Sequence, residues 1–321
     1  MMFRRTVLAA TLAFATALAG CETSDVLDLK ANAPIPEDVK SFMAANGMTK
    51  SSPIMIRLFK DEAVLEVWKQ RDTGRFALVK SYEICAYSGK LGPKIREGDR
   101  QAPEGFYSIS FNLLNPKSQY HLAFNTGYPN RYDRANGRTG SNLMIHGACS
   151  SAGCYSMTDE NIAEIYAFAR EALRGGKQDA FQVQAFPFRM TPENMARHRD
   201  DPNFEFWKML KTGYDHFELT KRPPKVEVCE RRYVFNQVPE QENMAFRAAQ
   251  ACPPAQVPQA LASAHYSYEK SWNEAFNAAV AKLDREEARE LAAAQKEAER
   301  EAERAEREAR RAAEIAALAG E

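Results

Sequence analysis

Six apolar runs between residues 54 and 147 constrain the fold of this 321-residue chain more than any other feature. Most of them are about as long as a single β-strand, and turn residues such as the "RDTG" stretch separate successive runs. With 45% hydrophobic residues, the chain has enough apolar surface to bury a core. The pattern predicts a mostly β domain. The runs are "IMIRLFK", "AVLEVWKQ", "RFALVKSYEICAYSG", "APEGFYSI", "YHLAFN" and "NLMIHG".

The pattern changes after residue 157, where apolar residues recur at the spacing of an α-helix. Thr158 is a candidate N-cap, Asp159 and Glu160 suit a first helical turn, and Gly175 can close the helix. Further along, "FQVQAF" and "KVEVCERRYVF" are typical of strands, whereas "TPENM" and "DPNFEFWKML" begin like helices with proline in the first turn. A first helix is expected near residues 36–45. Together these segments predict an α+β fold.

A charged tail begins at residue 267, after a proline-containing linker at 252–266. Favourable pairs four residues apart, such as Glu303 with Arg307, predict a helix. A sustained coiled coil needs apolar side chains at its a and d positions, and large apolar residues are few after residue 282. We therefore expect a solvated single helix, with weak self-association as a coiled coil as the alternative. These apolar residues are Leu283, Leu291, Ile315 and Leu318.

The first 20 residues have the features of a signal peptide. Arg4 and Arg5 precede an apolar run at residues 6–17, which is too short to span a bilayer comfortably. The "LAGC" that follows resembles a bacterial lipobox, which implies export to the periplasm, cleavage before Cys21 and lipidation of its thiol. The alternative is an ordinary secretory signal with a chance cysteine. Because Glu22 is not the aspartate that retains enteric lipoproteins in the inner membrane, we expect an anchor in the outer membrane.

The remaining cysteines are odd in number if Cys21 carries lipid. In an oxidising compartment, at least one thiol then stays free or pairs outside the chain. Cys229 and Cys252 are candidate disulfide partners. The five cysteines are Cys85, Cys149, Cys154, Cys229 and Cys252.

The stretch "HGACSSAGC" at residues 146–154 gathers a histidine and two cysteines, and three kinds of site are conceivable. A zinc site would need a matching second pair of ligands, and the sequence offers none. A disulfide between Cys149 and Cys154 is possible, but it would leave His146 and two glycines unexplained. A cysteine nucleophile with a histidine base uses the residues more fully, because the imidazole can take the proton of the thiol.

The expected local structure favours the nucleophile. A strand ending in His146 and a loop that carries Cys154 towards a helix would bring both groups to one sheet edge. Gly147 and Gly153 permit close approach of the backbone, and the N–H groups around Cys154 could form an oxyanion hole.

The segments "LMIHG" and "SAGC", preceded by "REGDRQAPEGFY" and "TGYPNRYDRANGRTG", resemble the YkuD-type L,D-transpeptidase family. The resemblance covers about residues 51–190 and is greatest to the YafK-like branch of murein-modifying proteins. By motif position, Cys154 matches the family nucleophile and His146 the base. Ser151 matches the Ser/Thr three residues before the cysteine, and Gly153 the residue just before it.

This resemblance implies a reaction without cofactor or metal. Cys154 would attack the carbonyl of the third-position diamino acid of a peptidoglycan stem peptide, and the thioester would pass to an amine or to water. A hydrolase that releases 3-3 crosslinks or a wall-attached protein is one alternative, and a non-catalytic wall-binding lipoprotein is another. The presence of both His146 and Cys154 argues against the last. With 43 basic and 43 acidic residues, the chain gives no electrostatic reason to expect nucleic acid.

The chain departs from the more common family pattern. Only seven residues separate His146 from Cys154, and Ala152 stands at the position of a motif histidine. Ser156 stands where many members have an arginine that can hold a substrate carboxylate, which favours hydrolysis over transfer to a second peptide.

Substrate contacts are expected from the loop before the motif. Arg138 could clamp a stem-peptide carboxylate, and Tyr128 and Asp133 could shape the cleft. The expected organisation is a signal peptide at 1–20, a tether at 21–50, a catalytic domain at 51–190, an accessory region at 191–251, the linker at 252–266 and the helical tail at 267–321.

Overall fold

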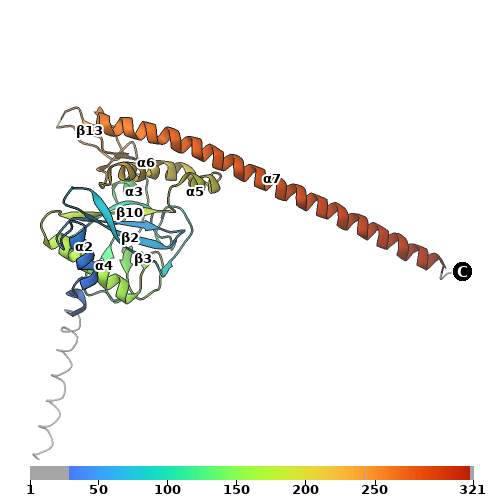
Figure 1. The fold of residues 1–321 in the computed structure, drawn as a ribbon, viewed down its shortest axis with the longest axis horizontal. Helices are drawn as coiled ribbons and strands as arrows, with labels where there is room; N and C mark the ends of the chain where they lie inside the picture. Colours follow the sequence, from blue (N-terminus) through green and yellow to red (C-terminus); the bar gives the residue numbers. More distant parts are fainter. Residues whose placement is uncertain (1–28, 242, 319–321) are drawn as a thin grey trace, which may run out of the picture. The chain divides into compact units, whose positions relative to one another are not determined.

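The computed structural model describes residues 29–241 and 243–318, so the predicted signal peptide and Cys21 lie outside the described residues. The chain forms two compact units (Figure 1). The first comprises the residues up to Arg189 together with Glu205–His265, and the second comprises Met190–Phe204 and the residues from Tyr266 onward. The predicted accessory region at 191–251 is thus divided between the two units. Mixed sheets with helices confirm the predicted α+β class.

Five strands of the first unit form sheet A, in the order β3-β2-β1-β10-β5. The central pair, β1 and β10, is parallel, and the other neighbours are antiparallel. All six residues of β1 are buried, including Arg57, which explains its continuous apolar run. The strands are β1 (Ile54–Phe59), β2 (Val64–Gln70), β3 (Phe76–Glu83), β5 (Gly105–Ser110) and β10 (Ala180–Phe186).

Five shorter strands form sheet B, in the order β4-β9-β8-β7-β6, and this sheet carries the "HGACSSAGC" motif. Strands β8 and β9 are parallel neighbours, with His146 paired to Ser156 in the register. The 3-10 turn η1 (Phe111–Leu113) leads from β5 of sheet A to β6 of sheet B. The strands are β4 (Ala86–Tyr87), β6 (Leu114–Asn115), β7 (Ala123–Asn125), β8 (Met144–His146) and β9 (Tyr155–Ser156).

Helix α4 (Asp159–Arg174) confirms the helix predicted after the motif and packs against strands of both sheets. The Thr158 hydroxyl caps it by accepting the N–H of Asn161. Ile162 and Ile165 are fully buried in the main core. The predicted first helix is present as α2 (Glu37–Ala45), which packs on β3.

Helix α6 (Phe204–Thr220) brings aromatic side chains against sheet A. The Tyr214 ring lies edge-on to that of Phe186, with 5.3 Å between centroids. A Cβ atom on Gly213 would lie 2.5 Å from the ring of Phe106, so only glycine permits this close packing. The remaining elements of this unit are α3 (Arg131–Ala135), β11 (Val226–Cys229), β12 (Arg232–Phe235), β13 (Val238–Pro239) and β14 (Ala255–Gln256).

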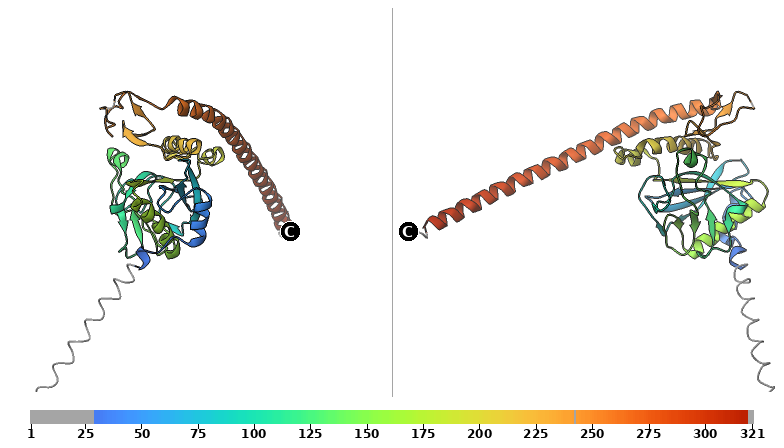
Figure 2. Two further views of the ribbon diagram at one scale, coloured as in Figure 1. Left: turned by 60° about the vertical axis from the view of Figure 1, so that its left-hand side comes forward. Right: turned by 180° about the vertical axis from the view of Figure 1, so that it is seen from behind.

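Within the second unit, α5 (Pro192–Arg197) is accompanied by most of α7 (Gln259–Leu318), a 60-residue helix that continues to the end of the described chain (Figure 2). The Trp272 indole donates to the carbonyl of Met190, and Phe276 stacks on Trp272. Beyond these contacts, the side chains of α7 are largely exposed. In the described part of the chain, no helix is both long and apolar enough to cross a membrane.

Candidate active site

The strand register places Cys154 and His146 close together on neighbouring, parallel segments of sheet B. His146 is the last residue of β8 and pairs with Ser156, and Cys154 directly precedes β9. Continued by one residue, the register sets Cys154 opposite Met144, two residues before His146 along β8. Diagonal neighbours in a sheet lie roughly 7–8 Å apart at the backbone, within reach of long and aromatic side chains. The backbones of Cys154 and His146 are therefore diagonal neighbours in sheet B.

The Cys154 thiol lies partly buried among backbone groups. The N–H of Met144 donates to its Sγ at 3.4 Å, and Sγ lies 3.9 Å from the carbonyl oxygen of Asn142. Burial raises the pKa of the thiol, while the Met144 N–H and the charge of Lys94 act in the opposite direction. The net effect is an increase, so the resting thiol is protonated at neutral pH and needs a base.

The His146 imidazole is 3% exposed and has a defined tautomer. Its Nδ1 lies 2.6 Å from the carbonyl oxygen of Gly147. Since a carbonyl only accepts, Nδ1 carries the hydrogen and Nε2 is left with a free lone pair. Burial lowers the pKa of His146, with the Gly147 contact opposing this, so the ring is neutral and can accept a proton. The Tyr120 ring covers the imidazole, with 4.7 Å between centroids.

The Ser151 hydroxyl organises the backbone at the nucleophile. It accepts the N–H groups of Gly153 at 3.3 Å and Cys154 at 3.1 Å, and it donates to the carbonyl of Cys154 at 2.7 Å. These N–H groups, in which an oxyanion hole was expected, thus donate to the Ser151 hydroxyl in this structure. Gly153 adopts a φ of 126°, which favours glycine over any residue with a side chain.

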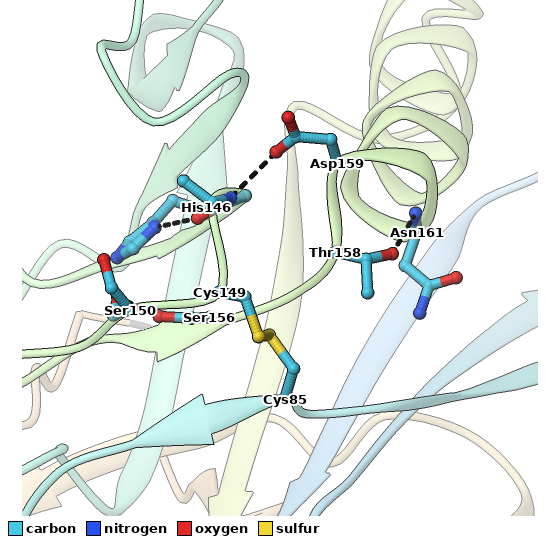
Figure 3. Close-up of a disulfide and its surroundings, with 10 residues drawn as sticks. Cys85, His146, Cys149, Ser150, Ser156, Thr158, Asp159 and Asn161 are labelled. Carbon is cyan, nitrogen blue, oxygen red and sulfur yellow. Dashed lines mark hydrogen bonds between the residues drawn. A yellow bond between two sulfur atoms is a disulfide. The ribbon is translucent and has the colours of Figure 1, made fainter.

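A disulfide that was not predicted from the sequence holds the loop between His146 and Cys154 (Figure 3). Cys149 is joined to Cys85, with 5.5 Å between Cα atoms, rather than to Cys154. Among the described cysteines, Cys154 alone is free. The partners are 64 residues apart, and no local pattern marks Cys85 as the partner.

Two hydrogen bonds from neighbouring elements fix the same loop, and Figure 3 shows the one that Asp159 accepts. Asp159, in the first turn of α4, accepts the N–H of Ala148 at 2.8 Å. The hydroxyl of Ser156 donates to the carbonyl of Ser150. Ser156 is fully buried, so it supports the loop and cannot contact a substrate carboxylate. Ala148 and Cys149 have positive φ values of 63° and 42°, a strained turn that these contacts maintain.

The three residues expected at the substrate site are largely buried. The Arg138 guanidinium forms an ion pair with Asp133 at 3.0 Å, with side-chain exposures of 8% and 0%. Tyr128 is buried, and its hydroxyl donates to the carbonyl of Lys94 at 3.3 Å. These residues therefore support the loop around Lys94, which is a correction to the carboxylate clamp expected at Arg138.

The two cysteines predicted as disulfide partners are close together in the structure. Cys229 and Cys252 form a disulfide that ties the end of β11 to the segment before β14, with 5.0 Å between Cα atoms. Among the described residues, no group of three or more His, Cys, Asp or Glu side chains could hold a metal ion.

Comparison with known proteins identifies relatives of this chain. The family model of the YkuD L,D-transpeptidase catalytic domain matches residues 56–184. A curated Escherichia coli (strain K12) protein, provisionally named the L,D-transpeptidase YafK, is 50% identical over 185 residues. The match covers 58% of this chain and 74% of that protein, and the Escherichia coli O157:H7 counterpart matches equally.

Solved structures show a more distant likeness. The helical cell shape determining protein Pgp2 from Campylobacter jejuni is 21% identical, with a TM-score of 0.34. The similar region covers 59% of this chain and 79% of the Pgp2 chain.

Proposed function

The chain belongs to the YkuD L,D-transpeptidase catalytic domain family, and on that premise we propose that it modifies peptidoglycan as a cysteine acyltransferase. Cys154 is the nucleophile, and His146 is first its base and then the acid that protonates the leaving group. The substrate is a stem peptide, cleaved at the carbonyl of its third-position diamino acid. No cofactor or metal takes part.

The reaction consists of two acyl transfers. Nε2 of His146 takes the thiol proton as Sγ of Cys154 attacks the carbonyl carbon. The tetrahedral intermediate collapses with loss of the amine of the fourth residue, which receives the proton from His146, and a thioester remains. An acceptor amine or water then attacks the thioester and gives its proton to His146. The thiolate leaves, takes up the same proton, and the neutral pair is restored.

One observation carries this proposal: the Nδ1–H of His146 is engaged by Gly147, so the basic nitrogen is Nε2, and the free thiol of Cys154 directly precedes the neighbouring strand β9. Neutral thiol and neutral imidazole fit a general-base mechanism. The protonation states support His146 as the base that the Cys154 thiol needs.

The acceptor is the open part of the proposal. The sequence argument for hydrolysis relied on Ser156 as a weak contact to an acceptor carboxylate, and that argument lapses because Ser156 is buried. The acceptor is an amine of a second stem peptide or of a wall-attached protein, or it is water, and product analysis decides among them.

Incubation of the purified chain with defined muropeptides, followed by mass analysis, tests the activity. Stem peptides shortened at the third residue, or joined to an added diamino-acid amine, are the expected products. Cys154→Ala and His146→Ala should yield neither. The proposal fails if the wild-type chain leaves the muropeptides unchanged or if Cys154→Ala produces the same products.

The proposed place of action is the periplasm, with lipid on Cys21 as the anchor in the outer membrane. The support for this is the "LAGC" sequence behind a short apolar run that Arg4 and Arg5 precede. Lipoprotein maturation attaches more than one acyl chain, as stable anchoring requires.

A further inference from the structure

A pocket of about 430 Å³ lies in the first unit, and neither Cys154 nor His146 lines it. Its walls come from β5, from the segment that follows β7, and from the start of the β11–β12 hairpin. Its volume falls in the range of pockets that hold small ligands. The polar lining includes Ser108, Thr126 and Gln182, and the pocket also includes Arg131, Arg134 and Lys225.

The pocket lies at the same edge of sheet B as the nucleophile. Cys154 precedes β9, and its Sγ accepts the N–H of Met144, the first residue of β8. Asn125, the last residue of β7, pairs with Met144, and Thr126 then continues into the pocket wall. Two strand spacings, roughly 10 Å in all, therefore separate Cys154 from this wall. An extended peptide covers that distance with about three residues.

The charges at the pocket favour an anion. Glu227 pairs with Arg131 at 2.8 Å and lies 3.8 Å from Lys225. Buried Asp133, which accepts from Tyr107 and Asn130 of the lining, is paired with Arg138. Arg134 is exposed and donates to the carbonyl of Pro129. Within the described part of the chain, no carboxylate forms an ion pair with Arg134. The guanidinium of Arg134 therefore retains donors for a carboxylate from outside the protein.

We propose that this pocket binds a carboxylate-bearing part of the acyl-donor stem peptide, roughly 10 Å from the carbonyl that Cys154 attacks, with Arg134 as the main carboxylate contact. The proposal rests on the proposed function and adds to it a residue that sets substrate affinity. Arg134 thereby takes the role of substrate-carboxylate contact that was expected for Arg138, because the guanidinium of Arg138 is paired with Asp133. A donor peptide is needed for both transfer and hydrolysis, so the proposal holds for either acceptor.

The test uses the full chain and two synthetic stem peptides, one with free carboxylates and one with the carboxylates before the third residue amidated. For Arg134→Ala, KM for the free-acid peptide should rise about threefold to tenfold with kcat unchanged, as expected for an exposed charge pair. Arg134→Lys should restore part of the affinity. Arg75→Ala, which removes an exposed arginine from the turn between β2 and β3, is the matched control and should leave KM unchanged.

Amidation supplies the second arm of the test. For the wild-type chain, the amidated peptide should show the same rise in KM, and Arg134→Ala should add nothing to it, because both changes remove one interaction. An unchanged KM for Arg134→Ala, or an equal rise with both peptides, overturns the pocket proposal while turnover still supports the proposed function. If the wild-type chain turns over neither peptide and Cys154→Ala binds neither by calorimetry, both proposals fail.

Discussion

The Ser151 hydroxyl and the Cys154 backbone are bound to each other twice, because Ser151 accepts the Cys154 N–H at 3.1 Å and donates to the Cys154 carbonyl at 2.7 Å. One side chain thus binds both the backbone N–H and the backbone carbonyl of the residue that carries the thiol. The hydroxyl also accepts the N–H of buried Gly153. The position of Sγ therefore depends on Ser151.

Ser151→Ala should lower kcat about 10- to 100-fold, since a misplaced reacting atom carries a penalty of this order. The unfolding free energy should fall by about 1–3 kcal/mol, because N–H groups lose their acceptor. Steady-state kinetics and thermal unfolding measure both effects. Ser150→Ala is the matched control, as the Ser150 side chain is exposed and its carbonyl, which accepts from Ser156, is retained. Equal kinetics for the two variants would contradict the positioning role.

The disulfide between Cys85 and Cys149 should contribute to stability more than to chemistry. Loss of a disulfide typically costs about 2–4 kcal/mol, so Cys149→Ala should unfold at lower temperature but retain substantial activity. Cys85→Ala should have the same effect, and the double variant should add little, since each single change already removes the bond. Thermal unfolding and turnover of the three variants test this.

A different outcome for Cys149 would be informative. If Cys149→Ala abolished turnover as completely as Cys154→Ala, without unfolding the chain, the assignment of Cys154 as sole nucleophile would be wrong.

Activity should depend on the protonation of His146 on the acid side. Burial lowers the pKa of the ring, so its neutral form persists below the ordinary histidine value of about 6.5. The expected kcat/KM is full at neutral pH and falls only as the pH drops through this lowered pKa. Because the thiol pKa is raised, no loss is expected between neutral pH and the ordinary thiol range. A pH–rate profile measures both limits, and an acid limb above 6.5 would contradict a buried neutral base.

The lipobox gives a prediction that is independent of the fold. Cys21→Ala should release the chain from membranes into the soluble periplasmic fraction, because the thiol that carries the lipid is gone. Cell fractionation with an antibody against the chain measures this, and Cys252→Ala serves as a control cysteine outside the signal region. Membrane association that survives Cys21→Ala would exclude the lipobox as the anchor.

The sequence predicted those parts of the molecule that local patterns determine. Helix α4 followed from its N-cap and apolar spacing, and His146 and Cys154 were identified because both belong to one nine-residue motif. The link between Cys149 and Cys85 could not be predicted, since sequence spacing does not determine which distant residues meet. The burial of Arg138 could not be predicted either, so the sequence analysis assigned this arginine to the substrate. Its pairing with buried Asp133 depends on how the loop folds, and the ion pair is visible only in three dimensions.

The most direct test of the central claim is intact-mass measurement of the full chain after a short incubation with a stem peptide. The account predicts a species heavier by the acyl part of the peptide, released by hydroxylamine as a thioester would be, and located at Cys154 by peptide mapping. His146→Ala should accumulate far less of it in the same time, and Cys154→Ala none. Turnover with no such adduct under any quench condition, or an adduct that persists in Cys154→Ala, would contradict the account.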